Sequence, residues 1–380
     1  MNLFPFGSHG YRISLHVGSG GVSGVCLKHE KDHATTIVHN HRSDVPIREH
    51  VQAKTLELHT GEAIERVLKN IHDTVKSRID HVDVIYTSPW FSTHTKTILI
   101  EHREPFVVTK KLIDDVTKKE MGALKLAAPS QDTILEQKIT RIRLNGYESQ
   151  NPFQKKVTQC ELTLFASFAS KEFIEKTSAA IHKIISPHHI SFHSFPFVSF
   201  SVLSRLWHTD QYFAHIDVGA EVTEVVCSEH GALSESFSFP LGTNHLVRAI
   251  AQKREIPHEL ALSLLSVYAR GAADAATSAA LETILKPLRE EWVAYIDQII
   301  RDSGGDHAVV QKIYLSADDV SLSLWSSVIQ LRSHRVVILT PDMFGQFIHM
   351  PPHTSVDALN MLESIFVDEK NISTFTGDVK

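Results

Sequence analysis

The pattern of apolar and polar positions predicts a mixed α/β protein. Over residues 61–79 the apolar side chains recur at the spacing of one helix face, with Thr60 in the position of an N-cap. These apolar positions are Ile64, Val67, Leu68, Ile71 and Val75. Apolar or alternating runs predict strands at residues 11–28, 34–40, 51–58 and 82–87. The first part of the chain therefore follows a β-β-β-α-β order.

The pattern changes over residues 100–188. A helix is expected at 110–121, followed by two long alternating segments that are joined by an Asn-Gly and Asn-Pro loop. The two alternating segments span 133–147 and 157–168. A second helix at 171–185 and a short strand at 190–193 follow. This α-β-β-α-β order predicts an α+β unit inserted into the first domain.

The remaining chain predicts a second α/β domain. A helix that returns to the first domain is expected at residues 195–206, and a polar tail is expected from residue 367. Between them lie expected strands at 312–316 and 335–339 and helices at 244–252, 259–270, 282–301 and 356–366. The predicted boundaries are a first domain at 1–99 with its return at 189–210, an insertion at 100–188, a second domain at 211–366 and a tail at 367–380.

Two hairpins carry the candidate chemistry. In residues 213–242 an apolar strand runs into Asp217 and then Gly219, and a second apolar strand follows at once. A carboxylate at a strand end, beside a glycine in a tight turn, can hold a phosphate and its metal. Residues 11–27 repeat this pattern, with a Gly-Ser-Gly-Gly turn at residues 18–21. The alternative is that each is an ordinary β-hairpin with a turn glycine.

The repeated hairpin resembles the actin-like ATPase superfamily, in which two related domains each offer a phosphate-binding hairpin to one nucleotide. Four further segments resemble FtsA, the actin-like cell-division protein of bacteria, and more loosely PilM of type IV pilus assembly. They are VIYTSPW (84–90), PFVVTKK (105–111), RLNGYESQNP (143–152) and FPLGTNHLVRAIA (239–251). The resemblance implies an actin-like (ribonuclease H-like) two-domain α/β fold with an inserted α+β subdomain of the FtsA type, called 1C.

The resemblance also implies a site for ATP and magnesium between the hairpins. Asp217 is then the candidate catalytic carboxylate, and no residue is assigned as a protein ligand to a metal. The candidate cofactor-binding residues are Gly18, Ser19, Gly20, Gly21, Asp217, Gly219, Ala220 and Gly242.

Two departures from the family pattern argue against nucleotide binding. His16 stands where the first hairpin normally has an aspartate, and a neutral imidazole is a poor ligand for magnesium. The adenosine-binding turn normally carries glycines, but here it reads Ala317–Asp318–Asp319. Two carboxylates at that turn would face an anionic nucleotide. The sequence therefore predicts a degenerate cleft in which nucleotide binding is weak or lost.

Composition indicates the cellular compartment and which classes of partner are expected. The net charge of −6 disfavours a general nucleic-acid surface, and three widely spaced cysteines fit a reducing cytoplasm. The chain holds 25 histidines, and a metal site near residues 188–193 is the alternative to packed or surface histidines. The polar tail lacks an apolar face, so membrane contact is expected only through a partner.

These observations favour a cytoplasmic scaffold of the FtsA type in cell division or envelope assembly, recruited to the inner face of the membrane by a partner. The resemblance implies self-association and protein partners for the inserted subdomain. The rival hypotheses are an active ATP-dependent polymerising ATPase and a PilM-like adaptor of type IV pilus assembly. A sugar kinase is a weaker alternative, because no dedicated catalytic base stands between the hairpins.

Overall fold

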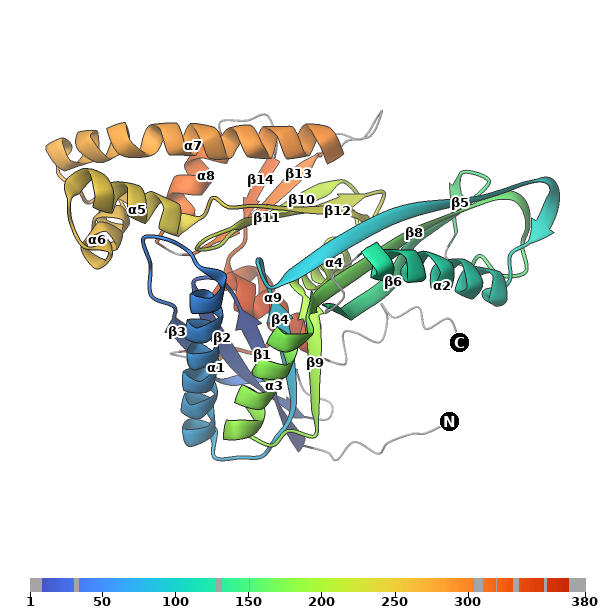
Figure 1. The fold of residues 1–380 in the computed structure, drawn as a ribbon, viewed down its shortest axis with the longest axis horizontal. Helices are drawn as coiled ribbons and strands as arrows, with labels where there is room; N and C mark the ends of the chain where they lie inside the picture. The colour runs from blue at the N-terminus through green and yellow to red at the C-terminus, as the bar shows by residue number, and fades with distance from the viewer. Residues whose placement is uncertain are drawn as a thin grey trace.

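The fold is built on two β-sheets with one common topology, and a third sheet extends to one side (Figure 1). The computed structural model describes residues 9–30, 34–127, 132–149, 151–303, 310–318, 320–330, 335–351 and 354–368. Asp319, residues 304–309 and the tail beyond Asp368 lie outside the described residues.

The first sheet has the strand order β3-β2-β1-β4-β9. The pairs β3–β2 and β2–β1 are antiparallel, whereas the pairs β1–β4 and β4–β9 are parallel. Helices α1 and α3 pack against each other and close an apolar core over one face (Figure 1). The elements are β1 (His9–Val17), β2 (Gly21–Glu30), β3 (Thr36–Asp44), α1 (Ala53–Val75), β4 (Ile79–Tyr86), α3 (Lys171–Ile184) and β9 (His189–Ser194).

The second sheet repeats this arrangement in the order β12-β11-β10-β13-β14, with the same pattern of antiparallel and parallel pairs. Its own core lies under α5 to α8. The two-domain α/β duplication that the repeated hairpin predicted is therefore confirmed. The elements are β10 (Phe213–Val218), β11 (Thr223–Glu229), β12 (Ala232–Phe239), α5 (Thr243–Arg254), α6 (His258–Ala269), α7 (Ala275–Ser303), β13 (Lys312–Ala317), α8 (Leu322–Gln330) and β14 (Arg335–Ile338).

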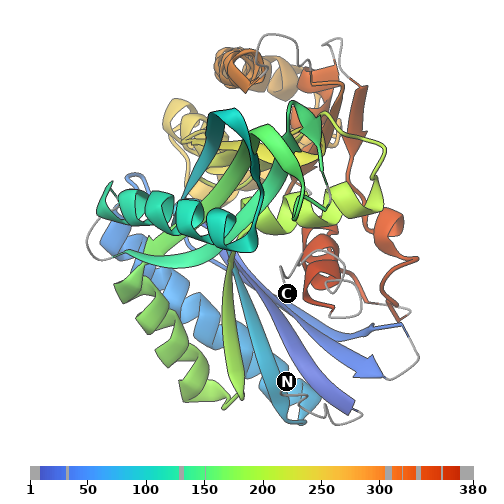
Figure 2. The ribbon, with the colours of Figure 1, turned by 90° about the vertical axis from the view of Figure 1, so that its right-hand side faces the viewer.

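The third sheet has the order β5-β8-β6-β7 and projects away from the other two (Figure 1). Helix α2 lies along one face of it (Figure 2). Because Phe91 pairs with Ala169, the chain enters and leaves this sheet at neighbouring points. The elements are β5 (Phe91–Val107), α2 (Lys110–Ala127), β6 (Asp132–Leu144), β7 (Tyr147–Glu148) and β8 (Lys156–Ser170).

Two helices join the domains between their sheets. α4 (Phe195–Leu206) and α9 (Ala358–Val367) pack against each other; α9 also contacts β1 and β2, and α4 contacts β11 and β12. The short helix η1 (Pro341–Phe344) adds Phe344 to the same apolar cluster. This cluster takes side chains from both sheets, among them Val25 and Phe213, so one shared core fixes how the domains face each other.

Two predictions from the sequence pattern differ from the structure. The strand expected at 51–58 and the N-cap expected at Thr60 are both wrong, because α1 begins at Ala53. It buries Leu56 and Thr60 on the same helix face as Ile64. β5 has no counterpart among the predicted elements. Most of its side chains are at least partly exposed, so it lacks a strong apolar alternation.

Gly24 on β2 offers a test of the packing between β2 and α1. A β-carbon at Gly24 would lie 2.7 Å from both Val67 Cγ1 and Ile71 Cδ1. We expect Gly24→Val to lower the free energy of unfolding by about 1–3 kcal/mol through overpacking. Urea denaturation measures this, with Gly61→Ala as the control, since a β-carbon at Gly61 meets nothing within 4 Å. Equal stabilities for Gly24→Val and wild type would contradict this packing.

Candidate functional site

The two predicted hairpins close with the same turn. In the β1–β2 turn the Gly18 N–H donates to the Gly21 carbonyl over 3.0 Å. In the β10–β11 turn the Gly219 N–H donates to the Val222 carbonyl, also over 3.0 Å. Each turn follows a strand that is central in its sheet, and both turns line one cavity between the domains. The sequence repeat is therefore a structural repeat.

The two turns touch. A β-carbon added at Gly20 would lie 2.2 Å from Ala220 Cβ, so only glycine fits at residue 20 in this arrangement. Beside this contact, the Glu221 N–H donates to Ser19 Oγ over 3.1 Å. A backbone N–H of the second turn is thus paired with the first turn. No space for a phosphate remains between Gly20 and Ala220.

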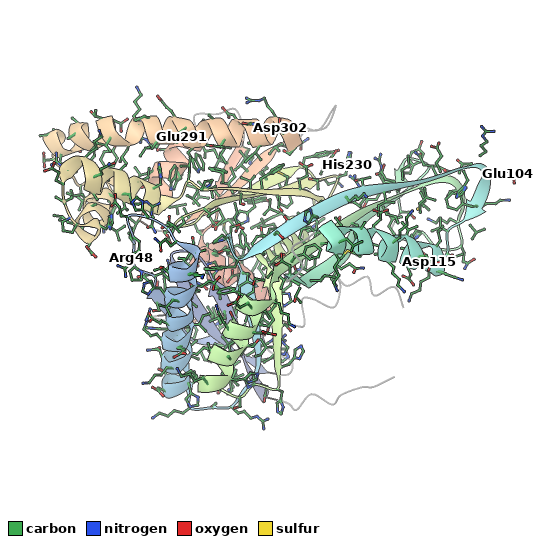
Figure 3. All side chains as sticks on the ribbon, viewed as in Figure 1. Arg48, Glu104, Asp115, His230, Glu291 and Asp302 are labelled. Carbon is green, nitrogen blue, oxygen red and sulfur yellow. The ribbon has the colours of Figure 1, made fainter. Side chains whose placement is uncertain are left out.

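A cavity of about 570 Å³ surrounds this contact. It is lined by both turns, by the end of β13 and by the start of α9. The domains meet again near Arg48 (Figure 3), whose carbonyl accepts from Arg248 Nη1 over 3.5 Å. The cavity is therefore a cleft between two domains that are in contact at its centre and also near Arg48.

The second turn is held by the start of α5. The N–H groups of Thr243 and Asn244 donate to the carbonyls of Gly219 and Ala220 over 3.0 and 2.8 Å. Gly242 allows this close approach, because a β-carbon there would lie 2.5 Å or less from both of those carbonyl oxygens. Glu221 is also fixed, since it accepts from Asn244 Nδ2 and from both Arg248 Nη atoms over 2.7–3.0 Å.

His16 forms a buried ion pair in this cleft. Its Nδ1 lies 2.7 Å from Glu363 Oε1 of α9, and the Glu363 side chain is fully buried. Burial acts to lower the pKa of His16. The charge and hydrogen bond of Glu363 outweigh it, with smaller contributions from Asp217 and Asp357, and raise the pKa to about 9. At neutral pH His16 is therefore a cation that ties β1 to α9.

Comparison with known proteins finds no matching protein-family model. It also finds no matching curated protein. Solved structures match over nearly the whole chain. A structure titled "PilM-PilN type IV pilus biogenesis complex" has a TM-score of 0.67 at 12% identity, covering 93% of this chain and 97% of that chain. The ethanolamine utilization protein EutJ from Carboxydothermus hydrogenoformans has a TM-score of 0.50 at 10% identity, covering 96% and 92%. The chain has the actin-like fold.

Most of the candidate residues lie together in the actin-like cleft. Those that line it are Gly18, Ser19, Gly20, Gly21, Asp217, Gly219 and Ala220, together with His16. Gly242 is not part of the lining and instead supports the second turn from behind. Ala317 and Asp318 line the cleft at the end of β13, as expected for the adenosine-binding turn. Their roles toward a nucleotide stay predictions.

Asp217 stands at the end of a buried chain of hydrogen bonds. Ser316 Oγ donates to Asp217 Oδ1 over 2.5 Å. Because that proton is used, His215 Nε2–H donates to Ser316 Oγ over 2.8 Å, and Ser199 donates to His215 Nδ1 over 2.5 Å. Burial lowers the pKa of His215 to about 3, so it stays neutral. The chain links Asp217 in the cleft to Ser199 on α4.

Glu224 of β11 makes a contact between the domains. Its Oε1 accepts from Ser88 N over 3.0 Å and from Ser88 Oγ over 2.7 Å, and Ser88 follows β4 of the first domain. Burial raises the pKa of Glu224 to about 8. Neither Glu224 Oε2 nor Glu363 Oε2 has a hydrogen-bond partner among the described residues. Glu224, which lines the cleft, and Glu363, which pairs with His16 of the lining, are thus buried carboxyl groups whose hydrogen bonding is only partly satisfied.

The charges of the cleft lining do not suit a phosphate chain. Two cationic side chains, His16 and Arg42, face a larger set of acids, and both cations are already paired. Arg42 lies 2.8 Å from Asp44 and 3.4 Å from Asp318 across the cleft. The acids that line the cleft are Asp44, Asp217, Glu224, Asp318 and Asp357. In this arrangement the two turns are in contact, and both cationic side chains of the lining are paired with acids.

Sequence reasoning missed Glu224 and Glu363. Glu224 directly precedes the apolar run Val225–Cys227 of β11, and Glu363 is the one carboxylate within α9, where apolar side chains predominate. A buried charge costs free energy unless it is paired, so a lone acid in such a run is a signal that could have identified both.

His193 of β9 and His81 of the neighbouring β4 are paired with acids. His193 lies 3.4 Å from Asp83 and 3.3 Å from Glu136, and His81 also lies 3.3 Å from Asp83. The charges and hydrogen bonds of these acids outweigh burial and raise the pKa of His193 to about 9. In the part of the chain that the structure describes, no group of three or more His, Cys, Asp or Glu side chains could hold a metal.

From the pKa shifts in the cleft we expect the free energy of unfolding to fall as the pH rises. The His16 ion pair stabilises the fold fully below the ordinary pKa of 6.5 and is lost as the pH passes about 9. Burial raises the pKa of Asp217 to about 7 and of Glu224 to about 8, so the native state binds protons that the unfolded chain has released. We expect the free energy of unfolding to drop by about 2–5 kcal/mol between pH 6.5 and 9, at about 1.4 kcal/mol per pKa unit.

Urea denaturation across this pH range tests the expectation. The double variant His16→Gln/Glu363→Gln keeps two hydrogen-bonding side chains but removes the ion pair. Its stability is expected to depend less steeply on pH above 7 than that of the wild type. A variant profile as steep as the wild type would show that the His16 ion pair does not produce the effect.

Proposed function

We propose that the chain is an actin-like adaptor or scaffold that works through protein contacts and has weak or no nucleotide binding. The observation that carries this proposal is the direct contact between the two hairpin turns, at Gly20 and Ala220 and at Ser19 and Glu221. In the family that the chain resembles, the phosphates lie between these turns. Here the turns meet each other.

The His16–Glu363 pair supports the same proposal. In the related ATPases the charged groups at the first hairpin are the magnesium ion and the nucleotide phosphates. Here the charged groups at that place are the two partners of the His16–Glu363 ion pair. Because the cation and the anion both belong to the chain, this pair needs no ligand to balance its charge. Two domains that stay closed, with no nucleotide to bind and release, would keep the same surface exposed to a partner at all times.

The biological setting is an adaptor in envelope assembly or cell division. The solved PilM structure was determined as a PilM–PilN type IV pilus biogenesis complex. The match covers 93% of the present chain. This likeness favours the PilM-like adaptor over the FtsA-type scaffold. In the proposed role the chain is cytoplasmic and reaches the membrane through a partner; no helix in its described residues is long and apolar enough to cross a membrane itself.

The second candidate is an active ATPase that polymerises with ATP. It is favoured by the survival of Asp217 and the glycine turns around a cleft of about 570 Å³. Opening of the two domains would be needed to admit a phosphate chain between the turns.

Calorimetric titration with ATP and magnesium separates the two candidates. We expect no binding at micromolar concentration, because the turns are in contact and both cations are paired. A dissociation constant near 1 μM, about −8 kcal/mol, would contradict the adaptor proposal. In that case Asp217→Ala should abolish the metal-dependent binding, with Asp342→Ala, an acid outside the cleft lining, as the control. A thermal melt of each variant shows whether it is folded.

The third sheet is proposed to be the contact surface for partners. We place its boundaries at residues 91–169, because Phe91 of β5 pairs with Ala169 of β8 and Ser170 already caps α3. Helix α3 packs on α1, and β9 pairs with β4. Replacement of residues 91–169 by a short Gly-Ser bridge should leave a folded two-domain core. The core should lose self-association and partner capture in sedimentation and pull-down assays. A folded core that keeps both would place the contact surface on the two main domains.

A further inference from the structure

β5 is an edge strand with one unpaired side. It pairs with β8, and no other strand within the described residues pairs with its far side. Its inner end approaches β12, where Thr93 Oγ1 lies 2.6 Å from Ser236 Oγ. Its outer half extends away from the two domains, and Glu104 lies near the far tip (Figure 3). The outer half therefore presents a row of backbone N–H and C=O groups to solvent.

An apolar triplet lies in the middle of this free edge. Leu99 is 52% exposed, and its neighbours Ile98 and Ile100 are partly buried against the core under α2. Successive side chains of a strand point to opposite faces, so Leu99 lies on the face away from α2. Charged side chains, lysine above all, normally protect an edge strand from pairing with another chain. The lysine nearest to Leu99 is Lys96, and it is paired with Glu120 of α2 over 2.5 Å.

The sequence around Leu99 is complementary to itself. In an antiparallel pair of identical strands with a two-fold axis at Leu99, Leu99 lies opposite Leu99 and Ile98 lies opposite Ile100. Thr97 then lies opposite Glu101, where its hydroxyl can donate to the carboxylate. Cross-strand pairs of these kinds stabilise a sheet. No like charges face each other over residues 97–101.

The regular part of β5 limits this pairing. The register with β8 shifts between Glu101 and Phe106, so the strand is regular only up to Glu101. A pair over residues 97–101 is short, and short edge contacts form weak or transient interfaces. Such an interface suits a scaffold whose copies are concentrated by a shared partner.

We propose that residues 97–101 of β5 pair in antiparallel fashion with the same residues of a second copy about a two-fold axis at Leu99. The pairing joins two four-stranded sheets into one continuous sheet across a dimer. It rests on the proposed function only in that the chain works through protein contacts. It makes no use of a nucleotide, so it is tested with the purified chain alone and independently of the ATP titration.

Disulfide trapping tests the register directly. Opposite Cα atoms in an antiparallel pair lie about 4.5–5.5 Å apart, within the range of about 4.4–6.8 Å that a disulfide spans. The three native cysteines are buried. We therefore expect Leu99→Cys to form a disulfide-linked dimer under mild oxidation. Leu126→Cys is the matched control, since Leu126 is 90% exposed but belongs to α2. Equal dimer yields for the two variants would overturn the proposal.

Sedimentation over a range of concentrations tests the contact without a cross-link. Leu99→Asp places two carboxylates opposite each other on the axis and should reduce dimer formation at least tenfold. Leu126→Asp makes the same change of charge outside the edge and should sediment like the wild type. A wild-type chain that stays monomeric at every concentration, together with no trapping at residue 99, would leave the edge to a different partner and refute pairing between copies.

Discussion

The arrangement of the molecule depends on the apolar core that α4 and α9 share with both sheets. This core takes Val25 and Leu27 from the first sheet, Phe213 and Val226 from the second, and Met361 from α9. Burial of large apolar side chains from both sheets disfavours separation of the domains near this core, because apolar surface would return to water. The core therefore brings the β1–β2 turn and the β10–β11 turn face to face.

The charges of the cleft follow from this enforced proximity. Asp217, Glu224 and Glu363 are all withdrawn from water, and His16 is the cation that compensates Glu363 directly. A carboxyl group that cannot be hydrated is either protonated or paired. Asp217 and Glu224 have raised pKa values, which favour the protonated form. Glu363 is instead paired with His16. The cleft thus satisfies most of its charge internally.

Much of the fold could be predicted because it depends on local pattern. The repeated strand-turn-strand segments around Gly18 and Gly219 indicated two related sheets, and both sheets have the same strand order. The start of α1 and the strand β5 could not be predicted as well. α1 gains its first turns from the burial of Leu56 against the first sheet, and β5 is fixed by its pairing with β8 over thirteen residues. These are long-range interactions that a local window does not contain.

The sequence by itself determined the two hairpins, their glycines and the replacement of the expected aspartate by His16, since each depends on residue type at a known place in a strand. The tertiary structure alone decided what these residues contact. That His16 faces Glu363, that Gly20 meets Ala220, and that Ser88 binds Glu224 all join positions more than 130 residues apart. Such partners are chosen by the packing of whole sheets and helices, because a buried charge or a tight turn is stable only against the particular neighbours that the fold brings to it.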